Sequence, residues 1–432
     1  MGVWLSGKYI NPEYLFQNMY KKRGEKSEGF FAKNRFWVAV ATLIGTIVGA
    51  GVLGIPYVIA KSGFVYGSIL IFVIGIAFVI FNLLMGEVVL RTKGQFQLTG
   101  YMERYLGKWG KRVMAFSMMF AIYGALTAYI MGEGEILKAI FGEPTFLSSI
   151  FSWLPGILLT FLQNNFYALL FFIVASFIVY KGVKAAGQVE LVIISLLILV
   201  VLLIGVLSFK HINLSNFNTF NPAYFYLPYG VILFSFIGAA AIPEMQEELG
   251  KNELKKMKKA LIIGSVVPLV LYFLFSVIVI GLVGLNNFEL LDANQRIATI
   301  ALSMYSNPIL GLLANIFAVF SMFTTFLTLG VALKEVYHYD YKINPHLAFI
   351  LTVMVPLFLA LAQIASFITA LAITGSIAGG LEGILVVLAY WKAKKKGNRK
   401  PEYTINIPKS IGMILIVLLG LGIAYQLWQQ FF

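Results

Sequence analysis

The chain has 432 residues, of which 59% are hydrophobic and 12% are charged, whereas soluble domains average about 45–50% apolar and about 25% charged residues. This composition excludes a soluble globular fold, and the lack of cysteine leaves no disulfides or thiolate metal sites. The net charge of +14 would suit nucleic acid, but the basic residues lie between apolar runs, where they set topology and contact anionic lipid. We therefore expect a multi-pass protein of the plasma or inner membrane with lipids, not nucleic acid, as partners.

The apolar residues come in runs of about 20, the length that a helix needs to span a bilayer. The first long run begins only near Phe36, so we expect no cleavable signal peptide and assign residues 1–35 to a cytoplasmic N-terminal segment. We predict an all-α polytopic fold with about eleven transmembrane helices, near residues 36–60, 64–90, 112–137, 160–180, 188–208, 224–243, 260–284, 308–333, 347–364, 367–391 and 410–430.

The basic residues indicate the orientation of these helices. If the N-terminus is cytoplasmic, Lys and Arg gather in the inner segments, and only Lys61, Lys138, Lys210 and Arg296 fall on the outer side. Cytoplasmic loops of membrane proteins carry such an excess, and shifting the helix count by one would destroy the asymmetry. We therefore expect the N-terminus inside and the C-terminus outside.

This orientation can be tested with accessibility tags. A tag placed after Phe432 should be labelled from outside the cell, and a tag placed before Gly29 should be labelled only from inside, because an odd number of spans separates the two ends. The measurement is labelling of intact cells with an impermeant reagent, with lysed cells as the control. Labelling of both ends from the same side would contradict the odd helix count.

The first predicted span contains an unusual density of helix-weakening residues. Gly45, Gly49, Gly51 and Gly54 precede Pro56 within an otherwise apolar run. A glycine weakens a helix by about 1 kcal/mol and a proline by about 3 kcal/mol. Unwound backbone at membrane depth is tolerated only where it is buried in protein or lines a cavity. We favour a broken helix here, with close packing of small residues as the alternative.

The sixth predicted span contains a second stretch of small residues, and both stretches end in Ile-Pro, at Pro56 and Pro243. The two spans are five apart, so they cross the membrane in opposite directions, which predicts an inverted repeat. The repeats would be residues 36–208 and 224–391, with the helix at 410–430 outside them. The substrate should then bind between the breaks, where helix N-termini favour an anion and C-termini favour a cation.

These stretches carry a family resemblance. Residues 45–57, Gly-Thr-Ile-Val-Gly-Ala-Gly-Val-Leu-Gly-Ile-Pro-Tyr, resemble the first-helix motif of the amino acid/auxin permease family, and prokaryotic aromatic amino acid permeases have a similar stretch. Phe-Ser-Phe at 234–236, followed by Pro243, resembles that family's sixth helix. The resemblance implies the leucine-transporter-like fold of the amino acid, polyamine and organocation superfamily, with a five-plus-five repeat and one extra helix. It also implies a secondary active transporter of an amino acid.

The resemblance further implies where the substrate binds. The amides around Ala50 would bind the carboxylate, carbonyls near Ser235 would bind the ammonium, and Phe236 would cover the site. Many members carry a histidine just after this stretch, where Gly238 and Ala239 stand here, so the side-chain selectivity stays open. The implied substrate-binding residues are Gly49, Ala50, Gly51, Tyr123, Ser235, Phe236 and Gly238.

The coupling ion is indicated by the eighth predicted span, where several hydroxyl residues lie on one helical face. In sodium-coupled relatives, hydroxyls of this helix and carbonyls of the first break surround the ion. The resemblance therefore implies a sodium site formed by Gly45, Val48, Ser321, Thr324 and Thr325. Ser and Thr in membrane helices often only bond back to their own backbone, which is the alternative role.

Proton coupling is the other alternative, and Glu382, which three glycines flank, is the best candidate for a proton relay. We expect no cofactor apart from the coupling ion, Na⁺ or H⁺. Histidine and aspartate occur only in loops or at helix ends, so an enzyme is disfavoured. A channel or a receptor remains as a function of another class, although a channel needs a continuous polar pore and a receptor needs no inverted pair of breaks. The transported amino acid and the oligomeric state stay open.

Overall fold

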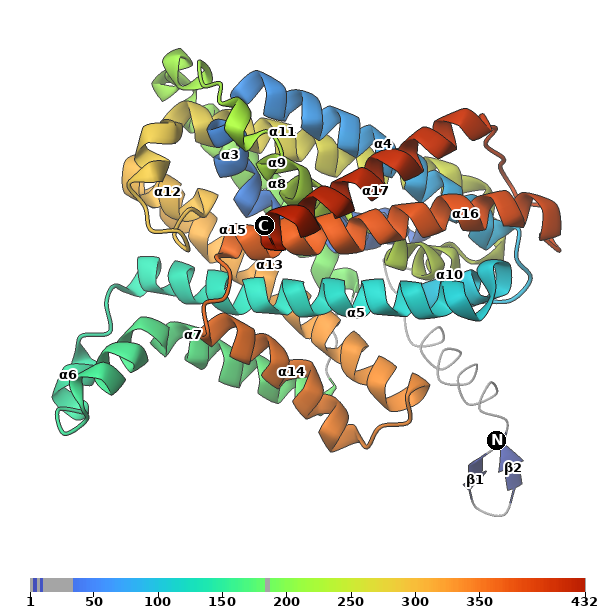
Figure 1. The fold of residues 1–432 in the computed structure, drawn as a ribbon, viewed down its shortest axis with the longest axis horizontal. Helices are drawn as coiled ribbons and strands as arrows, with labels where there is room; N and C mark the ends of the chain where they lie inside the picture. The colour runs from blue at the N-terminus through green and yellow to red at the C-terminus, as the bar shows by residue number, and fades with distance from the viewer. Residues whose placement is uncertain (1–2, 6–7, 11–33, 183–186, 432) are drawn as a thin grey trace.

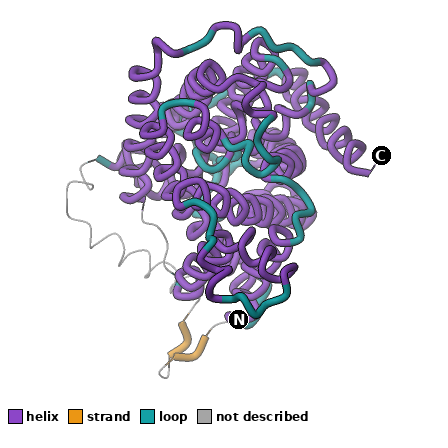
Figure 2. The backbone as a smooth tube through the Cα atoms, turned by 90° about the vertical axis from the view of Figure 1, so that its left-hand side faces the viewer, coloured by secondary structure: helices purple, strands orange, loops and turns teal. Residues whose placement is uncertain are grey.

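The computed structural model describes residues 3–5, 8–10, 34–182 and 187–431 (Figure 1). Nearly all of these residues are helical, as Figure 2 shows, which confirms the predicted all-α class. Within this part of the chain the strands are β1 (Val3–Leu5) and β2 (Lys8–Ile10), a short antiparallel pair. Most of the expected N-terminal segment 1–35, and Lys184 among the basic residues, lie outside the described residues.

Helices follow one another along the whole described chain. The first half forms α2 (Arg35–Ile47), α3 (Gly51–Ser62), α4 (Phe64–Leu90), α5 (Leu98–Phe141), α6 (Phe146–Ile150), α7 (Gly156–Lys181) and α8 (Gly187–Ser208). Between the halves lie the 3-10 turns η1 (Phe209–His211), η2 (Leu214–Phe217) and η3 (Pro222–Tyr224). The second half forms α9 (Leu227–Phe236), η4 (Ala239–Ala241), α10 (Ile242–Glu253), η5 (Leu254–Lys256), α11 (Met257–Glu289), α12 (Ala298–Tyr305), α13 (Pro308–Glu335), η6 (Val336–Asp340), α14 (Pro345–Leu361), α15 (Phe367–Thr374), η7 (Gly375–Gly379), α16 (Gly380–Lys396) and α17 (Lys409–Phe431).

Every predicted span falls mainly on helical residues, with the interruptions at 48–50 and 237–238 inside the first and sixth spans. By length and apolarity, 8 helical stretches of the described chain are able to cross a membrane, or 9 when α2 and α3 count as one bent span. One of these stretches, Pro222–Glu289, contains two of the predicted spans, and the apolar helix α14, with 17 residues, is too short to be one of the 8. The count of eleven, the two repeats and the direction of the termini stay predictions.

The longest helix, α5, runs across the middle of the molecule (Figure 1) and packs against α7, α13, α15 and α16. It begins at Leu98, earlier than the predicted span at 112–137, because an additional helical stretch precedes Gly107. Gly107 has a φ of 77°, a left-handed value that favours glycine, and it separates this stretch from the membrane-spanning part. The membrane-spanning part of α5 also brings Tyr129 to the first break.

Glycines allow a close helix crossing between α9, which ends at the second break, and the π-helical turn η7. A β-carbon at Gly375 would lie 2.5 Å from the backbone nitrogen of Phe234 and would collide with the carbonyl oxygen of Gly230. Both obstacles are backbone atoms, which cannot rotate away. Here the small residues serve close helix packing, as in other membrane helices.

The segment 397–408 connects α16 to α17 and covers the C-terminal end of α4; we call it the 397–408 strap. The Arg399 guanidinium donates a hydrogen bond to the Leu90 carbonyl at 2.7 Å. The Ile405 N–H donates to the carboxylate of the fully buried Glu87 at 2.6 Å. Because the last carbonyls of a helix have no partner in the helix itself, these contacts complete the end of α4.

Candidate functional site

Both predicted breaks are present. The first separates α2, which ends at Ile47, from α3, which begins at Gly51, and the two helices are bent by 52°. The second follows α9, which ends at Phe236, and precedes η4 and α10. The broken-helix interpretation is therefore confirmed for both segments, and the first N–H groups of α3 have no acceptor in their own helix.

The two breaks touch each other at Gly51 and Ser235. A β-carbon at Gly51 would lie 2.7 Å from Cβ and 2.8 Å from Cα of Ser235, and still closer to its hydroxyl oxygen. The Ser235 hydroxyl donates to the Val231 carbonyl at 2.7 Å, so its position is fixed by its own helix. Gly51 therefore permits the contact between the two breaks. This role is additional to the contact with the substrate carboxylate that the sequence resemblance implies.

Tyr129 of α5 faces the first break. A β-carbon at Gly49 would lie 2.9 Å from the Tyr129 hydroxyl oxygen, and this hydroxyl is in hydrogen-bonding contact with the Ala50 backbone. The tyrosine is 2% exposed. A phenol hydroxyl beside the N–H groups at the start of α3 provides a further donor for an anion.

Tyr123, the tyrosine expected at the site, lies elsewhere. Its hydroxyl is 2.6 Å from that of Tyr337 and donates to the Leu351 carbonyl at 3.1 Å. Six residues of an α-helix rotate the side chain by about 240°, so Tyr123 and Tyr129 face different neighbours. The structure therefore brings Tyr129, not Tyr123, to the first break.

Phe236 and Gly238 also differ from the expected arrangement. Phe236 is buried against α4 and α11, with its ring 6.1 Å from that of Phe78 and 5.2 Å from that of Tyr272. Phe236 therefore packs between helices, whereas the sequence resemblance implied that it covers the substrate. The half-buried Phe234 lies on another face of α9. A β-carbon at Gly238 would lie 2.6 Å from Ile47, so this glycine allows the second break to approach α2.

The hydroxyl residues of α13 lie beside the first break. The Thr325 hydroxyl donates to the Ser321 carbonyl at 2.8 Å, and a β-carbon at Gly49 would lie 4.0 Å from the Thr325 methyl group. The Thr324 hydroxyl bonds back to carbonyls of its own helix. The two carbonyls expected as ligands, of Gly45 and Val48, belong to the end of α2 and the break itself. Both threonine hydroxyls thus bond back to their own helix, which is the alternative role, and the sodium site stays a prediction.

Two buried carboxylates lie near the breaks. Glu382, on the first turn of α16, accepts a hydrogen bond from the Ala239 N–H at 3.3 Å, so it lies at the start of η4 in the second break. An anion is favoured at such a helix start. Glu133 lies one turn beyond Tyr129 on α5, and neither of its carboxylate oxygens has a hydrogen-bond partner among the described residues.

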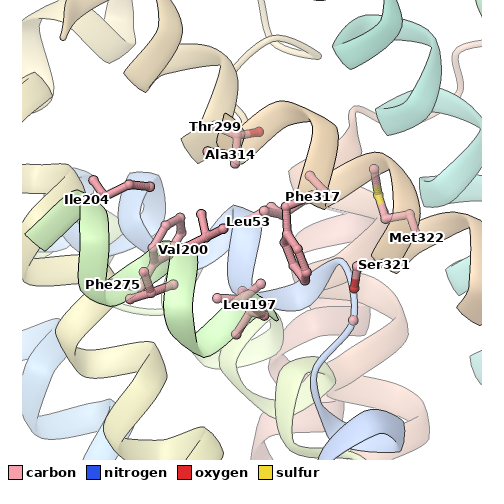
Figure 3. Close-up of a pocket in the computed structure, with 14 residues that line it drawn as sticks. Leu53, Leu197, Val200, Ile204, Phe275, Thr299, Ala314, Phe317, Ser321 and Met322 are labelled. Carbon is pink, nitrogen blue, oxygen red and sulfur yellow. The ribbon is translucent and has the colours of Figure 1, made fainter. Parts of the chain in front are cut away.

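An apolar cavity adjoins the first break (Figure 3). Its free volume is small, about 20 Å³, which is room for about one water molecule. Figure 3 shows the side chains converging from α3, α8, α11 and α13. Ser321 and the buried Thr299 contribute the side-chain oxygens of a lining that is otherwise apolar. Aromatic rings at Phe275 and Phe317 form part of its wall.

The described chain is similar to known amino acid transporters. It matches the tryptophan/tyrosine permease family over residues 32–429. It is 24% identical over 391 residues to "Glutamine transporter 2" of Aliivibrio fischeri, covering 89% of this chain and 95% of that protein. It is 23% identical over 398 residues to "Tyrosine-specific transport system 1" of Haemophilus influenzae, covering 88% of this chain and 92% of that protein. It is 23% identical over 410 residues to "Tyrosine-specific transport system 2" of the same organism, covering 90% and 95%.

Among solved structures, the crystal structure of MhsT in complex with L-phenylalanine resembles this fold with a TM-score of 0.63 at 14% sequence identity. The alignment covers 89% of this chain and 98% of that one, and it confirms the leucine-transporter-like fold. The matched family and relatives are transporters, which excludes the enzyme, channel and receptor alternatives.

The sequence motifs identified an amino acid permease correctly but assigned it to a different family. The first-helix motif resembles that of amino acid/auxin permeases, whereas the match across the chain is to another permease family. A glycine-rich break with a terminal proline serves the same backbone geometry in both, so this motif does not separate them. The chain is a multi-pass integral membrane protein that transports amino acids, and it belongs to the tryptophan/tyrosine permease family.

Proposed function

We propose that this permease is a sodium-coupled symporter of an aromatic amino acid that works by alternating access. The observation that carries the proposal is the junction at Gly51 and Ser235, where the start of α3 meets the end of α9 beside Tyr129. The family description and the names of the tyrosine-specific relatives support an aromatic substrate. The aromatic and aliphatic lining of the cavity beside Gly49 has the chemistry that an apolar side chain requires, and its lining residues would have to move apart to admit an aromatic ring.

The charged groups of the substrate fit the two helix ends. The carboxylate would accept hydrogen bonds from the N–H groups around Ala50 and Gly51 and from the Tyr129 hydroxyl, because a helix start favours an anion. The ammonium would donate to carbonyls near Ser235 and Phe236 at the end of α9, where the helix favours a cation. Each group is thereby bound by fixed backbone dipoles, and no charged side chain is needed.

The sodium ion would lie between the first break and α13. The hydrogen bond from the Thr325 hydroxyl to the Ser321 carbonyl brings these two oxygens within 2.8 Å of each other, and a β-carbon at Gly49 would lie 4.0 Å from the Thr325 methyl group. The Gly45 carbonyl lies in the last turn of α2, where carbonyl oxygens have no N–H donor within the helix. Hard cations prefer oxygen ligands of this kind. These contacts support the sodium site that the sequence motif implied.

Glu382 favours proton coupling as the second candidate. Its carboxylate is 5% exposed and binds the Ala239 N–H within the second break. Protonation would remove the negative charge from this helix start and weaken the bond, so proton binding would loosen the second break. Intramembrane carboxylates that lie at such functional elements are typical of proton relays.

Uptake into proteoliposomes tests the proposal. Labelled tyrosine, tryptophan, phenylalanine and glutamine are compared under a sodium gradient or a pH gradient, each applied alone. We expect uptake of an aromatic amino acid that the sodium gradient drives. Uptake that follows only the pH gradient, and that Glu382→Gln eliminates, would instead establish the proton mechanism.

Thr325→Val tests the sodium site directly. The variant keeps the branched shape of the side chain but removes the hydroxyl oxygen. We expect the half-saturating sodium concentration for thermal stabilisation to rise about tenfold or more, since a contact to a charged group contributes about 1.5–3 kcal/mol. Thr352→Val is the matched control, because the Thr352 hydroxyl makes the same 2.8 Å bond one turn back, on α14. An equal sodium response in both variants would exclude Thr325 as a ligand.

A further inference from the structure

The Tyr272 hydroxyl lies between the two half-helices that precede the breaks. Tyr272 belongs to α11 and is fully buried. Its hydroxyl oxygen is 2.8 Å from the Ile47 carbonyl oxygen and 2.8 Å from the Ser235 carbonyl oxygen. Ile47 is the last residue of α2, and Ser235 is in the last turn of α9. One side chain therefore joins the C-terminal ends of both half-helices.

Electrostatics make this an unusual position for a neutral group. A helix C-terminus carries a partial negative charge, and here two such ends converge on one point. Helix ends of broken membrane helices commonly coordinate a cation. A phenol has a single proton, so it donates to only one of the two carbonyls at a time or shares that proton between them.

We propose that the Tyr272 hydroxyl takes the place of a cation at this point and positions the two breaks for substrate binding. The proton supplies the positive end that the converging carbonyls require, so the junction holds without an ion there. The Ser235 carbonyl has two lone pairs, and one remains free for the substrate ammonium. Tyr272 is thus a positioning residue that acts on the substrate through the backbone of α9.

The proposal makes Tyr272 separate from the ion site beside Thr325. Tyr272 contacts the ends of α2 and α9 from α11, whereas Thr325 lies on α13, on the Gly49 side of the first break. The role of Tyr272 therefore does not depend on whether sodium or the proton is the coupling ion.

Removing the hydroxyl should convert this point into an ion site. Tyr272→Phe leaves two carbonyl oxygens facing a space of about the size of one oxygen atom. The Ile47 carbonyl keeps the Gly49 N–H as a donor at 3.1 Å, whereas the Ser235 carbonyl loses the donor that Tyr272 supplies. In buffer that contains only a large organic cation, we expect substrate affinity to fall about tenfold or more and the melting temperature to decrease. Added sodium or lithium should restore both in a saturable way, beyond any response of the unmodified protein.

The ion response is measured in four proteins, which separates this inference from the proposed sodium coupling. They are the unmodified chain, Tyr272→Phe, Thr325→Val and the double variant. A new cation response in Tyr272→Phe that persists in the double variant supports the proposal, even if the unmodified protein shows no sodium dependence. An ion response of Tyr272→Phe equal to that of the unmodified protein overturns it.

Two further variants keep the test decisive. Para-aminophenylalanine at position 272 offers two N–H donors, one for each carbonyl, so it should retain substrate affinity without a new ion response. Tyr66→Phe is the matched control, because its hydroxyl donates to the single carbonyl of Phe225 at 3.0 Å, and it should leave the ion response unchanged. If Tyr272→Phe does not fold, loss of substrate binding by the para-amino variant, purified in folded form, overturns the proposal, and retained binding supports it.

Discussion

Gly51→Ala is expected to abolish amino acid uptake and to lower the melting temperature, because the added carbon has no space. It would lie 2.8 Å from Cα of Ser235, a backbone atom that cannot rotate away. Overpacking of a well-packed interior typically costs about 1–3 kcal/mol. Here the cost falls on the contact that holds the two breaks together, so the substrate site should be lost first. Uptake into proteoliposomes and thermal melting in detergent measure the two effects.

Gly54→Ala is the matched control for this variant, one turn further along α3. A β-carbon there would lie 3.0 to 3.2 Å from the ends of three side chains, Ile368, Leu371 and Val231, which are able to shift. Adding Ser235→Gly to Gly51→Ala removes two of the three close contacts and should restore part of the uptake. Uptake by Gly51→Ala at the unmodified level would show that the breaks do not need this contact.

Tyr129→Phe should raise the KM for the substrate by about 10- to 100-fold while leaving the fold intact. The hydroxyl lies at the first break, and a hydrogen bond to a charged group contributes about 1.5–3 kcal/mol, with about 1.4 kcal/mol for each factor of ten. The ring, which supplies the packing, is retained. Concentration-dependent uptake measures KM, and thermal melting confirms the fold.

Tyr123→Phe provides the comparison on the same helix. Its hydroxyl bonds to Tyr337 and Leu351, away from the breaks. We expect this variant to lower stability slightly, by about 1 kcal/mol for a hydrogen bond between neutral groups, with little change in KM. A large KM effect at Tyr123 together with none at Tyr129 would return the substrate contact to the residue that sequence resemblance implied.

The breaks were predictable because their cause is local. Glycines and a proline within an apolar run weaken the helix wherever the run lies, and both Pro56 and Pro243 mark the half-helix that follows a break. The choice between Tyr123 and Tyr129 depends on how α5 is rotated about its axis, which the flanking residues do not determine. The family's tyrosine position therefore had to be found from the structure.

The same limit explains Phe236 and Tyr272. Residues two positions apart on a helix point about 200° apart, so Phe234 and Phe236 face different neighbours, and the sequence does not indicate which of them faces the substrate. In the sequence, Tyr272 is one of several tyrosines in apolar spans, and nothing beside it distinguishes it from the others. Its role is visible only in the structure, where the ends of α2 and α9 contact its hydroxyl. Ile47, at the end of α2, lies 225 positions before Tyr272 in the sequence.

The contact between α4 and the 397–408 strap has a consequence for how the protein is made. Ile405 lies 318 residues beyond Glu87, and Arg399 lies 309 residues beyond Leu90. A ribosome therefore delivers α4 long before the donors for its last turn exist. Until nearly the whole chain has been synthesised, the Glu87 carboxylate has Arg91, one turn away at 2.7 Å, as its early ion-pair partner. The hydrogen bonds that complete the C-terminal end of α4, one of the first helices to enter the membrane, therefore form only at a late step of assembly.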